Sequence, residues 1–544
     1  MFTIGLDYGT NTVRAIIVNS KNGELCGSSV FDYKHGQSGV ISDPTNPNVA
    51  RQHPADYIEG LEFTVKNALK SAGINNDEII GIGIDATAST PIPLDDKGVP
   101  LAFDKKFEDN LSAMAWLWKD HTSIAEAKEI TELAQSIRPR YLSVCGGTYS
   151  SEWYWAKVLH CARNSPDVFN STSRWIELSD FIPYLLTGQL VQNLCAAGHK
   201  GLYSPEWNGF VDKDFLNQLD PSLISVRESL SDEAFHVGTK AGSLNKEWAD
   251  KLGLKEGISV AVGNIDAHAG AVGSGVKPGT MIKIMGTSTC DIAVAPLEKK
   301  LPDIPGICGV AHESVLPGCY GLEAGQSAVG DIFNWFVNVI KPDGMKHDTL
   351  NKEAEKLKPG ESGLLALDWH NGNRCVLTDS ELTGMVLGLT LHSKPSEIFR
   401  AHVEATAFGA RLITDRYREY GVPIDRIITC GGIANKSPMT MQIYADVLNC
   451  IIEVSLEEQS CALGSAMAAA VVGGAHSDFE SAAESMIGEV EIAYTPIPDN
   501  VAIYNRLFDL YTNLHDLFGT SSYTKNQYKL MKELILIREQ VRND

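Results

Sequence analysis

The order of strand-like and helix-like segments in the first 85 residues constrains the fold most strongly. Three strand-like segments, at residues 3–8, 13–19 and 25–33, are separated by turns that contain glycine. Residues 54–72 have one apolar face, with a proline at the start and a glycine just past the end, which predicts an amphipathic helix. Residues 79–85, IIGIGID, then predict a buried strand that ends on a carboxylate. The resulting order is strand, strand, strand, helix, strand.

A similar order restarts at Glu256. Strand-like segments are expected at 258–262, 280–285, 291–295, 426–430 and 451–455, and helical ones at 396–420, 438–448 and 461–472. We therefore predict two α/β units, residues 1–255 and 256–544, with a helical tail after about residue 500. Because strands alternate with helices, we expect largely parallel sheets, with ligands outside the carboxyl ends of the strands. The Trp-rich residues 105–254 are interpreted as a substrate-specific insertion.

Charge and cysteine content restrict the partners. The formal net charge of −22 opposes nucleic-acid backbones and anionic lipid surfaces, so we expect no nucleic-acid and no membrane partner. It does not exclude a nucleotide, because Mg²⁺ and backbone N–H groups bind phosphates inside acidic proteins. The 11 Cys residues are scattered without a C-x-x-C pair, and the start lacks a basic segment followed by an apolar one. Both features are typical of a reduced, cytoplasmic protein.

A turn rich in small polar residues follows the first strand, in the sequence GLDYGTNTVR. Asp7 ends the strand, and Gly9 allows the backbone to turn tightly and approach a ligand. Thr10, Asn11 and Thr12 offer N–H groups and short polar side chains to phosphate oxygens. A carboxylate at Asp7 could hold Mg²⁺ through water, since Mg²⁺ gives up its water shell reluctantly. The alternative interpretation is an ordinary hairpin.

Two later segments have turns of the same kind. Residues 283–291, KIMGTSTCD, again place Gly and hydroxyl side chains between strands, so that two related domains could clamp one polyphosphate. Gly431 and Gly432 follow the strand at 426–430, and glycines there allow a base or ribose to lie against the backbone. Ordinary turns would explain each segment taken alone. The sequence has no G-x-x-x-x-G-K-[ST] motif, which excludes a P-loop enzyme.

Asp266, in the sequence GNIDAHAGAVG, is the candidate catalytic base. It stands among Gly and Ala residues at the start of the second unit, where a cleft between domains would open. Phosphoryl transfer needs positioning, charge neutralisation and a group that accepts the alcohol proton. A partly desolvated carboxylate suits the last role. The alternative is that Asp266 caps a helix N-terminus, and His268 nearby is interpreted as a packed residue.

The three turn segments together resemble those of the FGGY carbohydrate kinases, within the larger actin-like ATPase group, and the resemblance extends over essentially the whole chain. It implies an α/β fold of two actin-like (ribonuclease H-like) domains around an inter-domain cleft, with ATP and Mg²⁺ as cofactors. It also implies residue roles: Asp7, Gly9, Thr10 and Arg14 in the first phosphate segment, Gly286 and Thr287 in the second, Gly432 and Asn435 near the adenosine, and Asp266 as the base.

The sugar-binding candidates are marked less directly. Asp85 ends its strand and could bond a sugar hydroxyl or satisfy the following turn. Residues 115–123, AWLWKDHTS, place Trp118 and Asp120 in a plausible sugar-contacting mix, although a Trp pair in the core beside solvated charges is an equal alternative. Relatives acting on xylulose or glycerol carry a W-x-D-x-R motif here. This chain has Thr122 in place of the Arg, which argues against those substrates.

Other segments are similar to those of the bacterial L-ribulokinase branch of the family, including AGHKGLY, NIDAHAGAVG and GLEAGQSAVGDIFNWF. This resemblance implies that Lys200 and Glu323 bind ketose hydroxyls, with the backbone near Ala88 beside them. A Lys and a Glu can hold neutral hydroxyls through charge-assisted hydrogen bonds. We therefore expect ATP-dependent phosphorylation of L-ribulose to L-ribulose 5-phosphate in L-arabinose catabolism. A homodimer is the family expectation.

Three alternatives stay open. A kinase of the same family acting on D-ribulose or a pentitol would share these motifs. An actin-like ATPase with conformational output would share the phosphate turns, but it would not need the Trp-rich insertion. A catalytically silent sugar sensor would not need Asp266.

Overall fold

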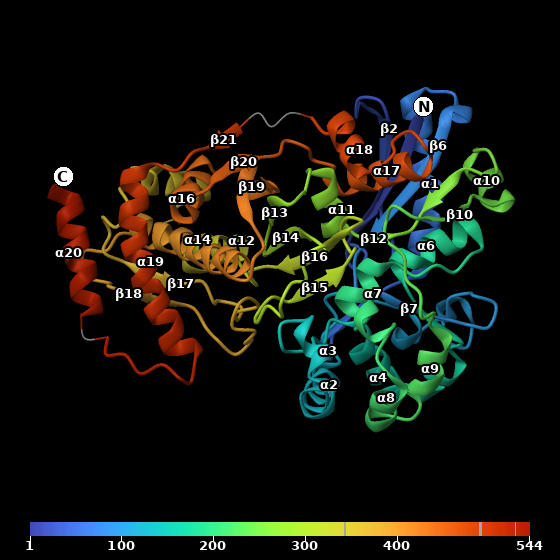
Figure 1. Cartoon of the computed structure of the whole chain (residues 1–544), viewed down its shortest axis with the longest axis horizontal. Helices are drawn as coiled ribbons and strands as arrows, with labels where there is room; N and C mark the ends of the chain where they lie inside the picture. Colours follow the sequence, from blue (N-terminus) through green and yellow to red (C-terminus); the bar gives the residue numbers. More distant parts are fainter. Residues whose placement is uncertain (342–343, 489–491, 528, 544) are drawn as a thin grey trace.

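The computed structural model describes residues 1–341, 344–488, 492–527 and 529–543. Within these ranges the chain forms two halves that lie along the long axis of the molecule, each built on a seven-stranded sheet with helices against it (Figure 1). The last two helices lie at the opposite end of the molecule from the N-terminus (Figure 1). The predicted α/β class is confirmed.

The first sheet has the strand order β10-β11-β6-β1-β2-β3, with β12 paired to β6. Its strands are β1 (Phe2–Tyr8), β2 (Thr12–Asn19), β3 (Leu25–Asp32), β6 (Ile79–Ala86), β10 (Lys240–Ser243), β11 (Ser259–Ala261) and β12 (Asn264–Ile265). Helix α1 (Pro54–Ala72) packs on β2 and β3 through its apolar face, as predicted. Gly73 ends α1 in the left-handed conformation, with φ of 62°.

The second sheet repeats the arrangement of the first, in the order β15-β16-β14-β13-β19-β20-β21. Its strands are β13 (Gly279–Met285), β14 (Thr289–Pro296), β15 (Gly309–His312), β16 (Cys319–Ala324), β19 (Ile424–Cys430), β20 (Ile451–Val454) and β21 (Ile492–Tyr494). In order, β16, β14, β13, β19 and β20 correspond to β3, β2, β1, β6 and β11. Each set joins two antiparallel pairings to two parallel ones.

Two expectations need correction. The sheets are mixed rather than largely parallel. Strands β1, β2 and β3 in the first sheet, and β13, β14 and β16 in the second, are joined without a helical crossover and pair antiparallel. The strand expected at residues 258–262 forms β11, and β11 and β12 pair with β6 in the first sheet instead of opening the second unit. The first sheet therefore extends past residue 255, the boundary expected from the sequence, to Ile265.

Two Gly- and Ala-rich helices, α11 (Asp266–Gly273) and α17 (Ser460–Val472), join the halves. They pack against each other, and α17 lies on β1 and β6 of the first sheet although it belongs to the C-terminal half (Figure 1). The contact requires glycine: a Cβ on Gly83 would lie 1.8 Å from the carbonyl oxygen of Ser465. This close packing fixes the carboxyl ends of β1 and β6 against both helices.

The insertion and the C-terminal tail add helices to the N-terminal and C-terminal halves, respectively. The insertion builds a separate aromatic-rich core and contains α2 (Ile124–Ile137), α3 (Arg140–Ser143), α4 (Tyr154–Asn164), α5 (Pro166–Ser171), α7 (Leu194–Lys200), α8 (Lys213–Leu219) and α9 (Leu223–Ser229). Helices α19 (Pro498–Gly519) and α20 (Leu530–Asn543) contribute side chains to the core of the C-terminal half. The predicted helical tail is confirmed.

The remaining elements connect or cover these parts. They are β4 (Ile41–Asp43), β5 (Asn46–Gln52), β7 (Pro91–Leu94), β8 (Ala115–Trp116), β9 (Arg174–Glu177), β17 (Leu365–Leu367), β18 (Met385–Leu387), α6 (Leu178–Thr187), α10 (Lys246–Leu252), α12 (Gly330–Trp335), α13 (His347–Ala354), α14 (Pro395–Glu419), α15 (Gly432–Lys436), α16 (Pro438–Leu448) and α18 (Phe479–Met486). None of the helices in the described ranges has both the length and the apolar character needed to cross a membrane.

Candidate active site

Buried acids gather where β1 and β6 end. Asp7 and Asp85 face each other in the parallel register of the two strands, and Asn264 of β12 pairs with Asp85 on the other side. Asp85 is fully buried and accepts a hydrogen bond from Ser465 Oγ at 2.6 Å through Oδ2, whereas Oδ1 has no partner in the described part of the chain. Burial and the charge of Asp7 hold the pKa of Asp85 well above its usual range.

The first phosphate turn links this acid pair to the insertion. The N–H of Gly9 donates to the carbonyl of Thr12 at 2.9 Å, which closes the turn between β1 and β2. Trp118 Nε1 donates to Thr10 Oγ1 at 3.0 Å. Arg14 on β2 lies opposite Asp7 on β1, with its Nη1 3.2 Å from the Asp7 carboxylate. Burial raises the pKa of Asp7, and the Arg14 guanidinium only partly opposes that effect.

The second turn occupies the corresponding place in the other half, between two antiparallel strands, but is one residue tighter. The N–H of Gly286 donates to the carbonyl of Ser288 at 2.9 Å, between β13 and β14. The carbonyls of Gly286 and Thr287 accept N–H groups from the start of α12, at 3.1 and 3.2 Å. Beneath the turn, Lys283 Nζ lies 2.8 Å from both oxygens of Asp291, and both residues are fully buried. Asp291 is therefore part of the scaffold.

The third turn lies next to the second. Gly431 follows β19, the parallel neighbour of β13, and has φ of 104°. A Cβ there would lie 2.4 Å from the carbonyl of Met285, so the approach to β13 requires glycine. Gly432 and Asn435 are exposed on α15, and a Cβ on Gly432 would meet nothing within 4 Å. The turn therefore presents an open backbone surface beside Gly286.

A cavity of about 890 Å³ lies between the two halves. Its wall includes Trp118, Trp153 and Lys200 from the N-terminal half and Thr287, Glu323 and Arg374 from the C-terminal half. The cavity thus joins the second phosphate turn to the side chains that the sequence marks as sugar ligands.

Lys200 and Glu323 form a two-pronged ion pair across this cavity. Lys200 Nζ lies 3.0 Å from each carboxylate oxygen of Glu323, and the residues are 7% and 8% exposed. Burial favours neutral Glu323, but the charge of Lys200 outweighs it and holds the carboxyl pKa well below its usual range. The Glu323 charge likewise keeps the pKa of Lys200 raised in spite of burial. Both groups are therefore charged at neutral pH.

Asp266 is the first residue of α11, directly after β12. Burial, and next the charge of Asp7, raise the pKa of Asp266 to about 7. Its Oδ1 accepts the N–H of Ala267 at 2.6 Å, and the residue that caps α11 is Ile265, so capping does not explain Asp266. The charges of Glu323 and Lys200 also act on the pKa of Asp266, the former raising it and the latter lowering it.

Ala88 lies beside α7 and the end of β12. It packs against Cys195 and Ala196 of α7 and against Ile265, the residue before Asp266. The next residue, Ser89, is held by Lys157 Nζ, which donates to its carbonyl at 2.7 Å. The loop after β6 therefore packs between α7 and the end of β12.

Most of the chain matches one family in comparisons with known proteins. Residues 2–273 match the N-terminal domain, and residues 281–472 the C-terminal domain, of the FGGY family of carbohydrate kinases. This chain belongs to the FGGY carbohydrate kinases.

Curated relatives cover nearly the full length. The ribulokinase of Anoxybacillus flavithermus is 42% identical over 538 residues, which is 95% of this chain and 94% of that protein. The ribulokinase of Halalkalibacterium halodurans is 41% identical over 538 residues, 95% of each chain. Among solved structures, a xylulose kinase from Rhodospirillum rubrum has a TM-score of 0.80 at 23% identity, covering 95% of this chain and all of that one. These structures bear out the two-domain FGGY fold.

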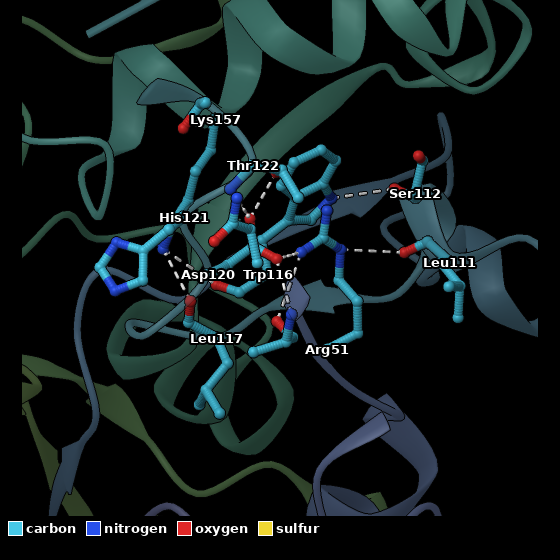
Figure 2. A network of polar contacts seen from close by, with 12 residues as sticks. Arg51, Leu111, Ser112, Trp116, Leu117, Asp120, His121, Thr122 and Lys157 are labelled. Atoms are coloured by element: carbon cyan, nitrogen blue, oxygen red, sulfur yellow. Dashed lines mark hydrogen bonds and ion pairs between the residues drawn. The ribbon is translucent and has the colours of Figure 1, made fainter. Parts of the chain in front are cut away.

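Asp120 has a structural role in this FGGY kinase, and the sugar-binding prediction for it is wrong. Its carboxylate is fully buried, pairs with Arg51, and accepts the N–H of Ala50 at 2.7 Å and the hydroxyl of Thr122 at 2.5 Å (Figure 2). Arg51 also lies over the ring of Trp116, 3.5 Å from its centroid. The carboxylate has no capacity left for a sugar.

Asp85 is also placed differently from the prediction. It is completely buried beside Asp7, with Ser465 against it, and is not among the residues of the cavity wall. Its carboxylate belongs to the acid pair under the first phosphate turn. Trp118 lines the cavity, and its role as a sugar contact stays a prediction.

Sequence reasoning missed several residues around this site. Arg374 lines the cavity, with Nη2 3.8 Å from Glu152 Oε1. Lys157 is fully buried in the apolar helix α4, and burial lowers its pKa to about 7. A lysine within the apolar run YWAKVLHCA is a signal that could have identified it. For Arg374 the local sequence offers no such signal.

Proposed function

We propose that this protein transfers the γ-phosphoryl group of ATP to the C5 hydroxyl of L-ribulose and thereby serves L-arabinose catabolism. The observation that carries the proposal is the Lys200–Glu323 pair, which shares one cavity with Thr287 of the second phosphate turn. The named ribulokinases, about 40% identical over nearly the full chain, support the choice of sugar.

The charged pair suits a neutral polyol. The ammonium of Lys200 donates hydrogen bonds and the carboxylate of Glu323 accepts them, so adjacent hydroxyls can bridge both groups. Trp153 lies beside the pair, with its ring centroid 5.5 Å from Lys200 Nζ, and offers an apolar face to the sugar carbons. In this arrangement Lys200, Glu323 and the backbone near Ala88 hold the ketose and direct its terminal hydroxyl toward Asp266.

Asp266 then accepts the proton of that hydroxyl as the oxygen attacks the γ-phosphorus. A base is most effective when its pKa lies near the working pH, and the pKa of Asp266 is raised to about 7. The leaving ADP carries the charge of the broken bond, and the backbone N–H groups of the two phosphate turns are positioned to bind the phosphate oxygens. Closing of the cleft excludes water and limits ATP hydrolysis.

Mg²⁺ fits the acid pair under the first turn. Asp7 and Asp85 are carboxylates on neighbouring strands; Asp85 is fully buried and the Asp7 side chain is 14% exposed. Their pKa values are raised, and Asp85 Oδ1 lacks a partner in the described residues. A hard cation with oxygen ligands would relieve this repulsion, with Asp7 as the ligand through water. When bound with ATP, Mg²⁺ would neutralise phosphate charge. Asp7→Ala should therefore raise the Mg²⁺ concentration needed for half-maximal rate, and an unchanged Mg²⁺ dependence would contradict this role.

The adenosine is expected against the third turn, where Gly431, Gly432 and Asn435 leave the backbone open beside Gly286. The parallel pairing of β13 and β19 sets the two turns side by side. One nucleotide can therefore contact both turns at once.

Coupled ADP release with Mg·ATP tests the proposal. The sugars are L-ribulose, D-ribulose, D-xylulose, ribitol and glycerol, each compared with a reaction that contains no sugar. We expect the highest kcat/KM with L-ribulose. A higher kcat/KM with D-ribulose or ribitol would show that the enzyme is an FGGY kinase for that sugar and not for L-ribulose. ADP release that is equal with and without sugar would refute the kinase assignment.

A further inference from the structure

A buried group of potential metal ligands lies behind the sugar candidates. Cys195 and His199 are four residues apart on α7, so they share one face of that helix, and His268 approaches from α11. One ligand atom of each residue lies within 4.8 Å of the others, and all three residues are buried. The two imidazole rings are 4.6 Å apart between centroids.

The hydrogen bonds of His199 fix which ring nitrogen is free. His199 Nε2 lies 2.9 Å from Ser314 Oγ, and the Ser314 hydroxyl donates its proton to the carbonyl of Ala311 at 3.3 Å. Ser314 must therefore accept a hydrogen bond from Nε2–H, which leaves a lone pair on Nδ1. That Nδ1 has no hydrogen-bond partner in the described part of the chain.

His268 has even fewer hydrogen bonds than His199. Its side chain is fully buried, and neither ring nitrogen has a hydrogen-bond partner among the described residues. Buried polar groups are almost always satisfied, so three unpaired imidazole nitrogens in one place call for an explanation.

Glu323 supplies a fourth ligand. Its Oε2 lies 3.6 Å from His268 Nε2 and 3.9 Å from His199 Nδ1. Thiolate, two imidazoles and a carboxylate are a typical donor set for zinc-like ions, and Mg²⁺ prefers oxygen alone. With bonds of about 2.0–2.3 Å, the ligand atoms of a tetrahedral zinc site lie roughly 3.3–3.8 Å apart. The ligand atoms of Cys195, His199 and His268, which lie within 4.8 Å of one another, need to approach by at most about 1.5 Å.

We propose that Cys195, His199, His268 and Glu323 bind one zinc-like divalent ion, and that this ion competes with the sugar for Glu323. Binding removes the thiol proton of Cys195 to solvent and pulls the carboxylate away from Lys200. Glu323 lines the cleft cavity, which provides the ion with a path to the buried ligands. Competition with sugar rests on the proposed function, whereas metal binding itself does not.

Co²⁺ titration of the full-length protein tests the site directly. Tetrahedral Co²⁺ gives intense visible bands, and a thiolate ligand adds a charge-transfer band in the near ultraviolet. We expect saturation at one equivalent with both signals, and Zn²⁺ should abolish them by displacement. Cys195→Ser should remove the charge-transfer band and weaken binding by more than about tenfold. Cys450→Ser, at a buried cysteine of the C-terminal half, is the matched control and should change neither signal.

Two outcomes overturn the site: no charge-transfer band in the parent protein, or an unchanged band in Cys195→Ser. His268→Gln provides a second variant should Cys195→Ser not fold, and it should lose the tetrahedral visible bands. Competition is tested separately, by adding L-ribulose to the Co²⁺-loaded protein. The proposal predicts that the sugar displaces Co²⁺, and unchanged spectra at saturating sugar would refute the competition. Kinase assays should show Zn²⁺ inhibition that L-ribulose relieves and that Cys195→Ser lacks.

Discussion

Replacing Asp266 with Asn tests the proposed base most directly. The amide has the shape of the carboxylate and keeps an oxygen for the N–H of Ala267, 2.6 Å away, so α11 should form normally. The amide cannot take a proton from the sugar hydroxyl. General-base assistance is worth about 10²–10⁴-fold, so kcat should fall by that factor. The loss corresponds to about 3–5 kcal/mol of activation free energy.

Coupled ADP release at saturating Mg·ATP and L-ribulose measures this kcat, and calorimetric titration measures sugar affinity. Affinity should stay close to that of the parent, because Lys200 and Glu323 are untouched. Asp214→Asn changes an exposed acid in the first turn of α8 in the same way and should have the parent kcat. A kcat for Asp266→Asn within about tenfold of the parent, in a normally folded protein, would refute Asp266 as the base.

Three further changes test other parts of the structure. The pKa of Asp266 is about 7, and only the deprotonated carboxylate can act as the base. The value of kcat/KM should therefore fall about tenfold per pH unit below pH 7 and level off above it. A kcat/KM that stays constant between about pH 5.5 and about pH 7 would contradict this role. Lys200→Met leaves the buried Glu323 charge unpaired, so denaturant titration should show a free energy of unfolding lowered by about 3–5 kcal/mol. A decrease below about 1 kcal/mol would argue that water already solvates the pair. Gly83→Ala puts a Cβ 1.8 Å from the Ser465 carbonyl and should lower the free energy of unfolding by about 1–3 kcal/mol. Unchanged thermal unfolding would refute the close packing of α17 on β6.

The local pattern predicted the elements well where a segment specifies its own structure. The bounds of α1 and α16 agree with the expected helices, because one apolar face, a proline at the start and a suitable residue at the end define each helix. The repeated strand order also followed from pattern alone. The sheet to which β11 belongs did not follow from the pattern. It is specified by the pairing of β11 with β6, about 175 residues earlier in the chain.

The same distinction explains the site. Asp7 and Asp266 could be proposed from the sequence as functional residues because each ends or follows a strand within a recognisable motif, and their roles stay predictions. Asp120 was misassigned because its partner, Arg51, comes from another part of the chain, and no local signal indicates that the charge is already compensated. The pairing of Lys200 with Glu323 spans 123 residues and was expected only through the family resemblance.

The placement of Asp266 explains how one carboxylate can serve both domains. It follows β12, which belongs to the first sheet, and begins α11, which packs on α17 from the C-terminal half. Glycine contacts along α17 leave little room for sliding, since a Cβ on Gly464 would lie 1.9 Å from the carbonyl of Ala269. If the domains close around their substrates, they must therefore rotate about the α11–α17 contact, because the two helices cannot slide past each other. Asp266 would then keep its position relative to Asp7 while the second phosphate turn approaches.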